Sequence, residues 1–243
     1  MRVAEGPAPS APLPARLAGA RVLDLNLDQT QAPFTDASGN NNNFTQFVGV
    51  SSVTAGVNRG LRFEPAPGIS SDYIKIPSPA ADATLNFAQP MSIEMWIKPE
   101  TARPNQARQT LIAKGVGGYS GNHVYSLALD SQFKLVFDTS RDGNSGRTSN
   151  FSAVPGQWNH VAMTLNNGTL KFYLDGREEV INRVTMGAPR TGTDVYIGTS
   201  PANPGSQYYR GLMDEVRMYN TVLSFQDIQN QYTGLRNFVL PEQ

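Results

Sequence analysis

A carboxylate in the middle of an apolar strand is the first residue of this sequence that could do chemistry. The segment Gly211–Asn220, GLMDEVRMYN, is a predicted strand, and alternation of its side chains would turn Asp214 toward the protein core. Three apolar residues share that predicted side: Leu212, Val216 and Met218. An ionised carboxylate there is costly without a partner cation, several hydrogen bonds or a metal ion. Asp214 is therefore a candidate metal ligand, and the other two arrangements remain as alternatives.

Histidine and cysteine chemistry is limited by the composition. The chain has no cysteine, so disulfides, thiolate catalysis and Cys-type zinc sites are excluded. Its two histidines, His123 and His160, do not have the HExxH-like spacing that would favour zinc. His160 shares a strand face with Trp158, and although such a pair could stack on a sugar, packing is the favoured interpretation. The sequence has no nucleophile elbow, Walker loop or dinucleotide-binding loop.

The charge balance argues against nucleic acid and anionic lipid as partners. Lys plus Arg and Asp plus Glu number 20 each, so the chain has no net basic field. No apolar run approaches the roughly 18 residues of a membrane span, and we expect no membrane insertion. With 243 residues, of which 39% are hydrophobic, the chain is long enough to form one large β domain.

The first 20 residues differ from the rest in composition. Four prolines exclude a helix or an interior strand there and favour an extended arm: Pro7, Pro9, Pro12 and Pro14. The stretch lacks the continuous apolar segment of a secretory signal. Because such an arm has few contacts of its own, we expect other protein chains of an assembly to hold it. The predicted organisation is an arm at 1–20, one domain at 21–235 and a tail at 236–243.

Beyond residue 20, short apolar segments alternate with Gly, Asn and Pro turn signals. Regular spacing of this kind is typical of an antiparallel sandwich or barrel. The predicted strands are 22–27, 60–63, 73–76, 91–98, 110–114, 124–129, 133–137, 158–165, 170–174, 195–198 and 212–219. Alternation is clearest at Ile93, Met95 and Ile97, so these strands are expected to bury one face.

Two local signals indicate a hairpin and a helix. The pair Asp175-Gly176 between two strands is typical of a two-residue type I′ turn, in which both central residues have positive φ. Ser224 followed by Asp227 indicates the start of a short C-terminal helix. The predicted fold class is therefore all-β, with an antiparallel sandwich and this one helix.

Several blocks of sequence, taken together, resemble a known family. They are TDASGNNNNFTQFVG (35–49), GLRFE (60–64), SDYIKIP (71–77), MSIEMWIKP (91–99), GQWNHVAMTL (156–165), GTLKFYLDG (168–176), DVYIGTS (194–200) and GLMDEVRMYNTVLSFQDIQNQY (211–232). Their order is similar to that of the laminin-G-like, concanavalin A-like jelly rolls, which include the pentraxin type. The resemblance implies a jelly-roll sandwich of two antiparallel sheets. It also implies a domain that binds rather than catalyses and that commonly holds a structural calcium ion.

The resemblance implies calcium ligands at three positions of this chain, Asp36, Asn41 and Asp214. Calcium takes about six to eight oxygen ligands, and a Gly-Asn-rich loop supplies carbonyl and amide oxygens. The chain differs from the usual family loop at Phe44, where glycine is common. The alternative is that Asp36 forms an Asx-turn and that Asp214 accepts backbone hydrogen bonds.

Two neighbouring tyrosines are candidates for contact with a ligand or partner. Tyr208 and Tyr209 lie in the predicted loop SQYYRG. Aromatic rings on loops suit both sugars and protein partners, and we expect these two rings to be exposed.

The arm and the resemblance together predict a non-catalytic attachment or decoration module. It would be displayed on a phage capsid or a cell-surface structure, and so be found at a virion or cell surface. A soluble carbohydrate-binding lectin is the alternative. A glycoside hydrolase of the same fold is the third candidate, but the family's Glu-x-Asp-x-x-Glu signature is absent. Asp214 and Glu215 are adjacent and would point to opposite faces, which does not suit a catalytic pair.

Overall fold

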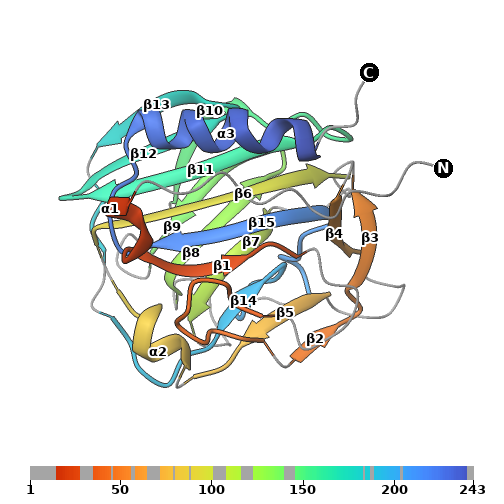
Figure 1. Cartoon of the computed structure of the whole chain (residues 1–243), viewed down its shortest axis with the longest axis horizontal. Helices are drawn as coiled ribbons and strands as arrows, with labels where there is room; N and C mark the ends of the chain where they lie inside the picture. Colours follow the sequence, from red (N-terminus) through yellow and green to blue (C-terminus); the bar gives the residue numbers. More distant parts are fainter. Residues whose placement is uncertain are drawn as a thin grey trace.

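The computed structural model describes thirteen segments of the chain. They are residues 15–27, 35–44, 46–55, 58–64, 72–78, 80–87, 89–100, 108–115, 123–139, 146–182, 184–186, 189–202 and 205–239. Their strands form two antiparallel sheets that stack into a sandwich (Figure 1). No helix in these segments is long and apolar enough to cross a membrane.

The first sheet, here the eight-stranded sheet, contains the long central strands. Its members are β1 (Arg21–Leu25), β3 (Ser51–Ala55), β4 (Asn58–Phe63), β6 (Met91–Pro99), β11 (Asn159–Asn166), β12 (Thr169–Leu174), β13 (Arg177–Asn182) and β15 (Gly211–Tyr219). The order is β13-β12-β11-β6-β15-β4-β3, and β1 also pairs with β15. The first and last strands of the chain are thus neighbours.

The second sheet, here the seven-stranded sheet, lies behind the first in Figure 1. Its members are β2 (Gln46–Val48), β5 (Tyr73–Ile76), β7 (Arg108–Gly115), β8 (His123–Asp130), β9 (Lys134–Asp138), β10 (Arg147–Ser152) and β14 (Val195–Ile197). The order is β10-β9-β8-β7-β14-β5-β2. The predicted all-β jelly-roll class is confirmed, because both sheets are antiparallel and strands distant in sequence pair within each.

The core lies between the two sheets and follows the predicted alternation. Ile93, Met95 and Ile97 of β6 are all fully buried in it. Leu170, Phe172 and Leu174 of β12, the second strand along from β6 in the same sheet, are buried in the same core. On the opposite sheet, Ile74 and Ile197 point into the same cluster. Burial of alternating side chains therefore defines an inner and an outer face for each sheet.

A β-bulge in β15 corrects the predicted direction of Asp214. The pairing of β15 with β6 shifts register between Asp214 and Arg217, and Glu215 has a φ of 53°. An extra residue in one strand reverses the alternation beyond it. Met213 and Val216 consequently both face the main core, whereas Asp214 lies on the outer side, opposite Trp96 in register. The expectation that Asp214 faces the core is wrong for this reason.

The predicted hairpin and C-terminal helix are both present. Asp175 and Gly176 have φ of 48° and 75°, as a type I′ turn requires, and they join β12 to β13. The helix α3 (Phe225–Val239) begins after Ser224, whose backbone N–H donates to Asp227 Oδ2 at 2.7 Å. The Asp227 N–H donates back to Ser224 Oγ at 3.2 Å, which completes a capping box.

Elements outside the prediction are short. The strands β2, β3 and β10 were not expected, and neither was α2 (Ala80–Thr84). Lys114 is fully buried, and its Nζ donates to Asp82 Oδ1 at 2.8 Å and to the Thr193 carbonyl at 2.6 Å, which ties α2 to the sandwich.

The predicted arm differs from the structure at its end. Residues 15–18 form a short helix, α1 (Ala15–Ala18), instead of continuing an extended path to residue 20. Leu17 is buried against Tyr219 and Ile228, and Arg16 pairs with Asp227. The four prolines of the predicted arm lie outside the described residues. At the other end, α3 runs to Val239, beyond the predicted domain limit at residue 235.

Candidate functional site

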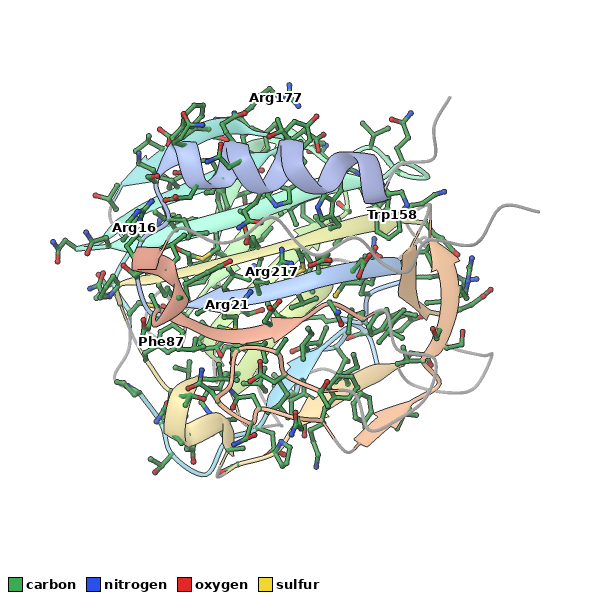
Figure 2. The ribbon with its side chains drawn as sticks, viewed as in Figure 1. Arg16, Arg21, Phe87, Trp158, Arg177 and Arg217 are labelled. Carbon is green, nitrogen blue, oxygen red and sulfur yellow. The ribbon has the colours of Figure 1, made fainter. Side chains whose placement is uncertain are left out.

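The outer face of the eight-stranded sheet is closed by a charged layer. Arg217 is 2% exposed, its Nε donates to Asp24 Oδ1 at 2.9 Å, and it also pairs with Glu215 (Figure 2). Tyr219 donates its hydroxyl to Glu94 Oε1 at 2.8 Å. Burial works to raise the pKa of Glu94, but hydrogen bonding and charge from neighbouring cationic groups lower it overall. Arg217, together with Arg21, which also pairs with Asp24, offsets the negative charge of these carboxylates, so this layer is structural.

The same face is covered by helices and aromatic rings. Trp96 stacks on Tyr232 of α3 with ring centres 5.9 Å apart, and His160 lies 5.3 Å from Trp96. Trp158 is 9% exposed and belongs to the same cluster. The packing interpretation of Trp158 and His160 is confirmed. Figure 1 looks onto this face, with α3 over its upper strands and α1 at its left edge.

The outer face of the seven-stranded sheet has a floor of small side chains. One row of directly paired residues crosses it: Lys75, Tyr196, Ala113, Ser126 and Asp138. Residues directly opposite in antiparallel strands share a face, so the whole row points away from the core. Thr110 and Ala128 pair in the next row on the same face. Four small side chains therefore lie in the middle of this sheet, and none of them is more than 4% exposed.

Two buried polar groups on that floor have unsatisfied atoms. His123 pairs with Gly115, two residues beyond Ala113, and therefore shares this face. His123 and Asp138 are 4% and 5% exposed, yet His123 Nδ1 and Asp138 Oδ1 have no hydrogen-bond partner among the described residues. A buried polar atom left unpaired costs about 1–3 kcal/mol. A polar group of a ligand could satisfy both atoms.

The other polar atoms of His123 and Asp138, Nε2 and Oδ2, do have partners within the protein. His123 Nε2 lies 3.0 Å from Ser200 Oγ, and Arg108 Nη1 donates to Asp138 Oδ2 at 2.8 Å. Burial lowers the pKa of His123, and Arg108 lowers it further against the opposing charge of Asp138. Ser200 is fully buried, and its hydroxyl holds the orientation of the imidazole.

An aromatic pair borders the other side of this face. Tyr73 and Tyr196 are half-buried, with ring centres 5.7 Å apart and planes tilted by 59°. Burial, with smaller effects of Asp194 and Tyr73, raises the pKa of Tyr196 to about 12, so its hydroxyl is protonated at neutral pH. Lys75 lies beside the rings, 3.5 Å from Asp194 Oδ2. The face thus combines partly exposed rings with buried hydrogen-bonding groups.

We expect the free energy of unfolding to fall as the pH is lowered from about 7 to about 5, in part because of His123, whose ordinary pKa is about 6.5. The pKa of His123 is lower in the folded protein, so below about pH 6.5 the unfolded chain binds more protons. The stabilisation is present above the unfolded pKa and is lost as pH falls toward the folded one. Urea unfolding at several pH values gives the free energy of unfolding as a function of pH, and this free energy should depend less on pH in His123→Gln than in the unchanged protein. An equal dependence on pH in the two proteins would contradict this contribution.

The loop that was expected to bind calcium is held by its own hydrogen bonds. Asp36 Oδ1 accepts from the backbone N–H groups of Asp24 and Ser38, each at 2.9 Å. Asp36 Oδ2 accepts from the Ser38 hydroxyl at 2.8 Å and from the Asn42 N–H at 3.0 Å. The Ser38 contact forms the Asx-turn that was the alternative. Both carboxylate oxygens are therefore engaged by the chain, which fits a calcium ion poorly.

The other two predicted ligands do not add a metal centre in the described segments. Asn41 is exposed, with a φ of 58° that suits asparagine in a turn. Asp214 is fully buried, and its Oδ1 accepts from the Glu215 N–H at 2.8 Å. Across the segments described above, no three acidic or histidine side chains are grouped to hold a metal ion. Calcium binding at Asp36, Asn41 and Asp214 stays a prediction.

The expected exposure of Tyr208 and Tyr209 is wrong. Tyr209 is fully buried, donates its hydroxyl to the Leu212 carbonyl at 2.8 Å, and meets Phe63 edge to face. Tyr208 is 9% exposed and bridges to Thr110 of β7. The segment lies against the sheet instead of projecting as a loop, because burying two aromatic rings is strongly favourable.

A comparison with known families decides the classification. Residues 68–229 match the family described as the concanavalin A-like lectin/glucanases superfamily, Laminin_G_3. The chain belongs to the concanavalin A-like superfamily. This superfamily includes both lectins and glucanases by name, so membership gives the fold and leaves the activity to the site.

A curated relative shares the sequence of this concanavalin A-like chain at a low level. It is the adhesion G-protein coupled receptor V1 of Danio rerio, 27% identical over 166 residues. The match covers 60% of this chain and 2% of the receptor, so the chain spans a very small part of that protein.

Solved structures of the same concanavalin A-like fold include binding domains. A botulinum neurotoxin type C, which enters cells through interaction with two ganglioside molecules, aligns with a TM-score of 0.68 at 16% identity, over 91% of this chain and 52% of that one. Domain 4 of AbnA, a GH43 extracellular arabinanase from Geobacillus stearothermophilus, was solved in complex with arabinotriose. It aligns with a TM-score of 0.64 at 16% identity, over 88% of this chain and 98% of that domain. At this identity the likeness establishes the fold.

Sequence reasoning missed the groups on the seven-stranded sheet. Ser126 and Asp138 occupy outward positions of largely apolar strands, and Tyr196 does so in DVYIGTS. The strands β7, β8 and β9 follow one another in the sequence, but Tyr196 joins this face only through the pairing of the distant β14 with β7. Ala113, Ala128 and Val136 also face outward, so the sequence shows no regular alternation of polar and apolar residues there.

Proposed function

We propose that this chain is a non-catalytic module that binds carbohydrate on the outer face of its seven-stranded sheet. The single observation that carries the proposal is the pair of buried atoms, His123 Nδ1 and Asp138 Oδ1, that have no partner among the described residues. Sugar hydroxyl groups both donate and accept hydrogen bonds, so they can satisfy a carboxylate oxygen and an imidazole nitrogen together.

The aromatic side of the face supports the same proposal. A pyranose ring presents C–H groups on one side, and half-buried tyrosine rings offer a matching apolar surface with a polar hydroxyl at the edge. Tyr73 and Tyr196 provide two such rings next to the small floor at Ala113. The eight-stranded sheet offers no equivalent surface in its described part, because α3 covers its outer face.

Catalysis on this face is disfavoured by the spacing of its carboxylates. Asp138 and Tyr196 lie in one row of the sheet, three strands or about 14 Å apart. Asp194 is two residues from Tyr196, directly before β14, so the carboxyl groups of Asp138 and Asp194 are separated by at least that distance. Glycoside hydrolysis requires two carboxyl groups about 5–9.5 Å apart. Asp138 and Asp194 are also each paired with a cation. The proposal is therefore binding without turnover, and a domain of this fold in complex with arabinotriose supports carbohydrate as the ligand.

Replacing Tyr196 with alanine is expected to weaken binding of the best oligosaccharide by about two- to tenfold, because one aromatic contact is worth about 0.5–1.5 kcal/mol. The probe is chosen by screening the protein on an oligosaccharide array and is then measured by titration calorimetry. Phe225→Ala is the matched control, since Phe225 is 49% exposed on α3 at the opposite sheet. Absence of binding to every oligosaccharide, or equal affinity for both variants, would refute the proposal.

Display at a cell or particle surface is a further part of this proposal. An extracellular site would suit a carbohydrate-binding module, and the fold relatives are a toxin and an extracellular enzyme. The attachment role through the predicted arm, residues 1–20, on a phage capsid or a cell-surface structure stays a prediction, and residues 1–14 of that arm lie outside the described segments. Binding of this arm to other protein chains of an assembly also stays a prediction.

A further inference from the structure

We propose that the outer face of the seven-stranded sheet binds uncharged sugars in preference to sugars that carry a carboxylate or sulfate. The inference rests on the proposed carbohydrate binding and adds the chemical class of ligand. It depends on how the charges of this face are paired and on which hydrogen-bonding atoms remain for a ligand.

Two cations of this face in the described part of the chain are already paired. Arg108 Nη1 lies 2.8 Å from Asp138 Oδ2, and the Arg108 side chain is 24% exposed. Lys75 Nζ lies 3.5 Å from Asp194 Oδ2, with side chains 21% and 26% exposed. A third cation, Lys134, is four residues from Asp138 along β9, or about 13 Å. An anionic sugar next to either pair would therefore meet a carboxylate as well as a cation.

The unsatisfied carboxylate oxygen also discriminates by hydrogen bonding. Asp138 Oδ1 is an acceptor that requires a donor from the ligand. A sugar hydroxyl supplies that donor, whereas an ionised carboxylate or a sulfate has no proton to give and would be repelled. His123 adds no compensating positive charge at neutral pH, because burial lowers its pKa.

The test compares neutral sugars with their acidic counterparts. The array carries each oligosaccharide in a neutral form and in a sialylated or uronate form, for example lactose and 3′-sialyllactose, and calorimetry follows on the strongest pair. We expect the neutral form to bind at least about tenfold more tightly, as one unfavourable charge contact near a protein surface allows. Equal or tighter binding of the acidic form would overturn this inference while leaving carbohydrate binding intact. No binding to either form would overturn the proposed function itself.

Two variants test the physical basis of the preference. Asp194→Asn and Asp138→Asn each release a cation, Lys75 or Arg108, and each is expected to narrow the preference for the neutral sugar by about threefold or more. Glu178→Gln is the matched control, because it releases Lys171 from a 3.1 Å pair on the opposite sheet. A preference that is unchanged in both folded aspartate variants would overturn the charge-pairing account. A narrowed preference in Glu178→Gln would overturn it as well.

Discussion

Replacing Arg217 with alanine lowers the free energy of unfolding by about 3–5 kcal/mol, the cost of leaving a buried carboxylate without its cation. Arg217 is 2% exposed, and its guanidinium contacts Asp24 and Glu215. Burial opposes its charge, but Glu215, Asp24 and Glu94 raise the pKa of Arg217, so the cation is permanent. Without it, the buried carboxylates of Asp24 and Glu215 are left without this cation, and urea unfolding measures the loss.

The controls for this prediction use the same type of residue. Arg177→Ala removes an exposed arginine from the edge strand β13 and should change stability by less than about 0.5 kcal/mol. Arg217→Lys retains the charge but not the planar fork, and we expect an intermediate loss. If Arg217→Ala unfolds at the same urea concentration as Arg177→Ala, the charged layer does not stabilise the fold as described.

Replacing Gly198 with alanine is expected to cost about 3 kcal/mol or more, since positive φ and a steric clash each cost about 1–3 kcal/mol. Gly198 follows β14 with a φ of 89°, and an added Cβ would overlap the ring of Phe63. The ring cannot easily move, because Phe63 is fully buried and packs edge to face on Tyr209. Thermal unfolding of the variant measures the effect.

Gly192→Ala separates the two causes. Gly192 also has positive φ, 71°, but an added Cβ there meets nothing within 4 Å. The expected loss is about 1–2 kcal/mol, from the backbone conformation alone. A Gly198→Ala variant no less stable than Gly192→Ala would contradict the close approach of Phe63.

The fold was predictable because its signals are local and repeated. Strand β5 has the predicted bounds, and the Asp175-Gly176 turn and the Ser224 cap lie where expected. Each depends on neighbouring residues whose chemistry suits a single conformation. The strands β2, β3 and β10 lie at sheet edges, where fewer apolar residues are buried and the alternation that reveals a strand is weaker.

The candidate site was less predictable because it depends on pairing between distant segments. The bulge at Glu215 gives a non-glycine residue positive φ, for which the sequence has no marker, and it reversed the predicted side of Asp214. Tyr208 and Tyr209 follow polar residues typical of a loop, yet tertiary contacts bury both rings. His123 and Asp138 come from neighbouring strands of one sheet and form no motif in the sequence.

The placement of α1 and α3 gives this domain a back and a front. Both helices lie against the eight-stranded sheet, where Leu17 and Ile228 pack on Tyr219, and they are the described elements nearest to the two chain ends. The tyrosine pair of the seven-stranded sheet lies on the other side of the sandwich from both helices. A truncation that removed α3 would therefore expose Trp96 and Tyr219 on one sheet and leave Tyr73 and Tyr196 of the other sheet in their present surroundings.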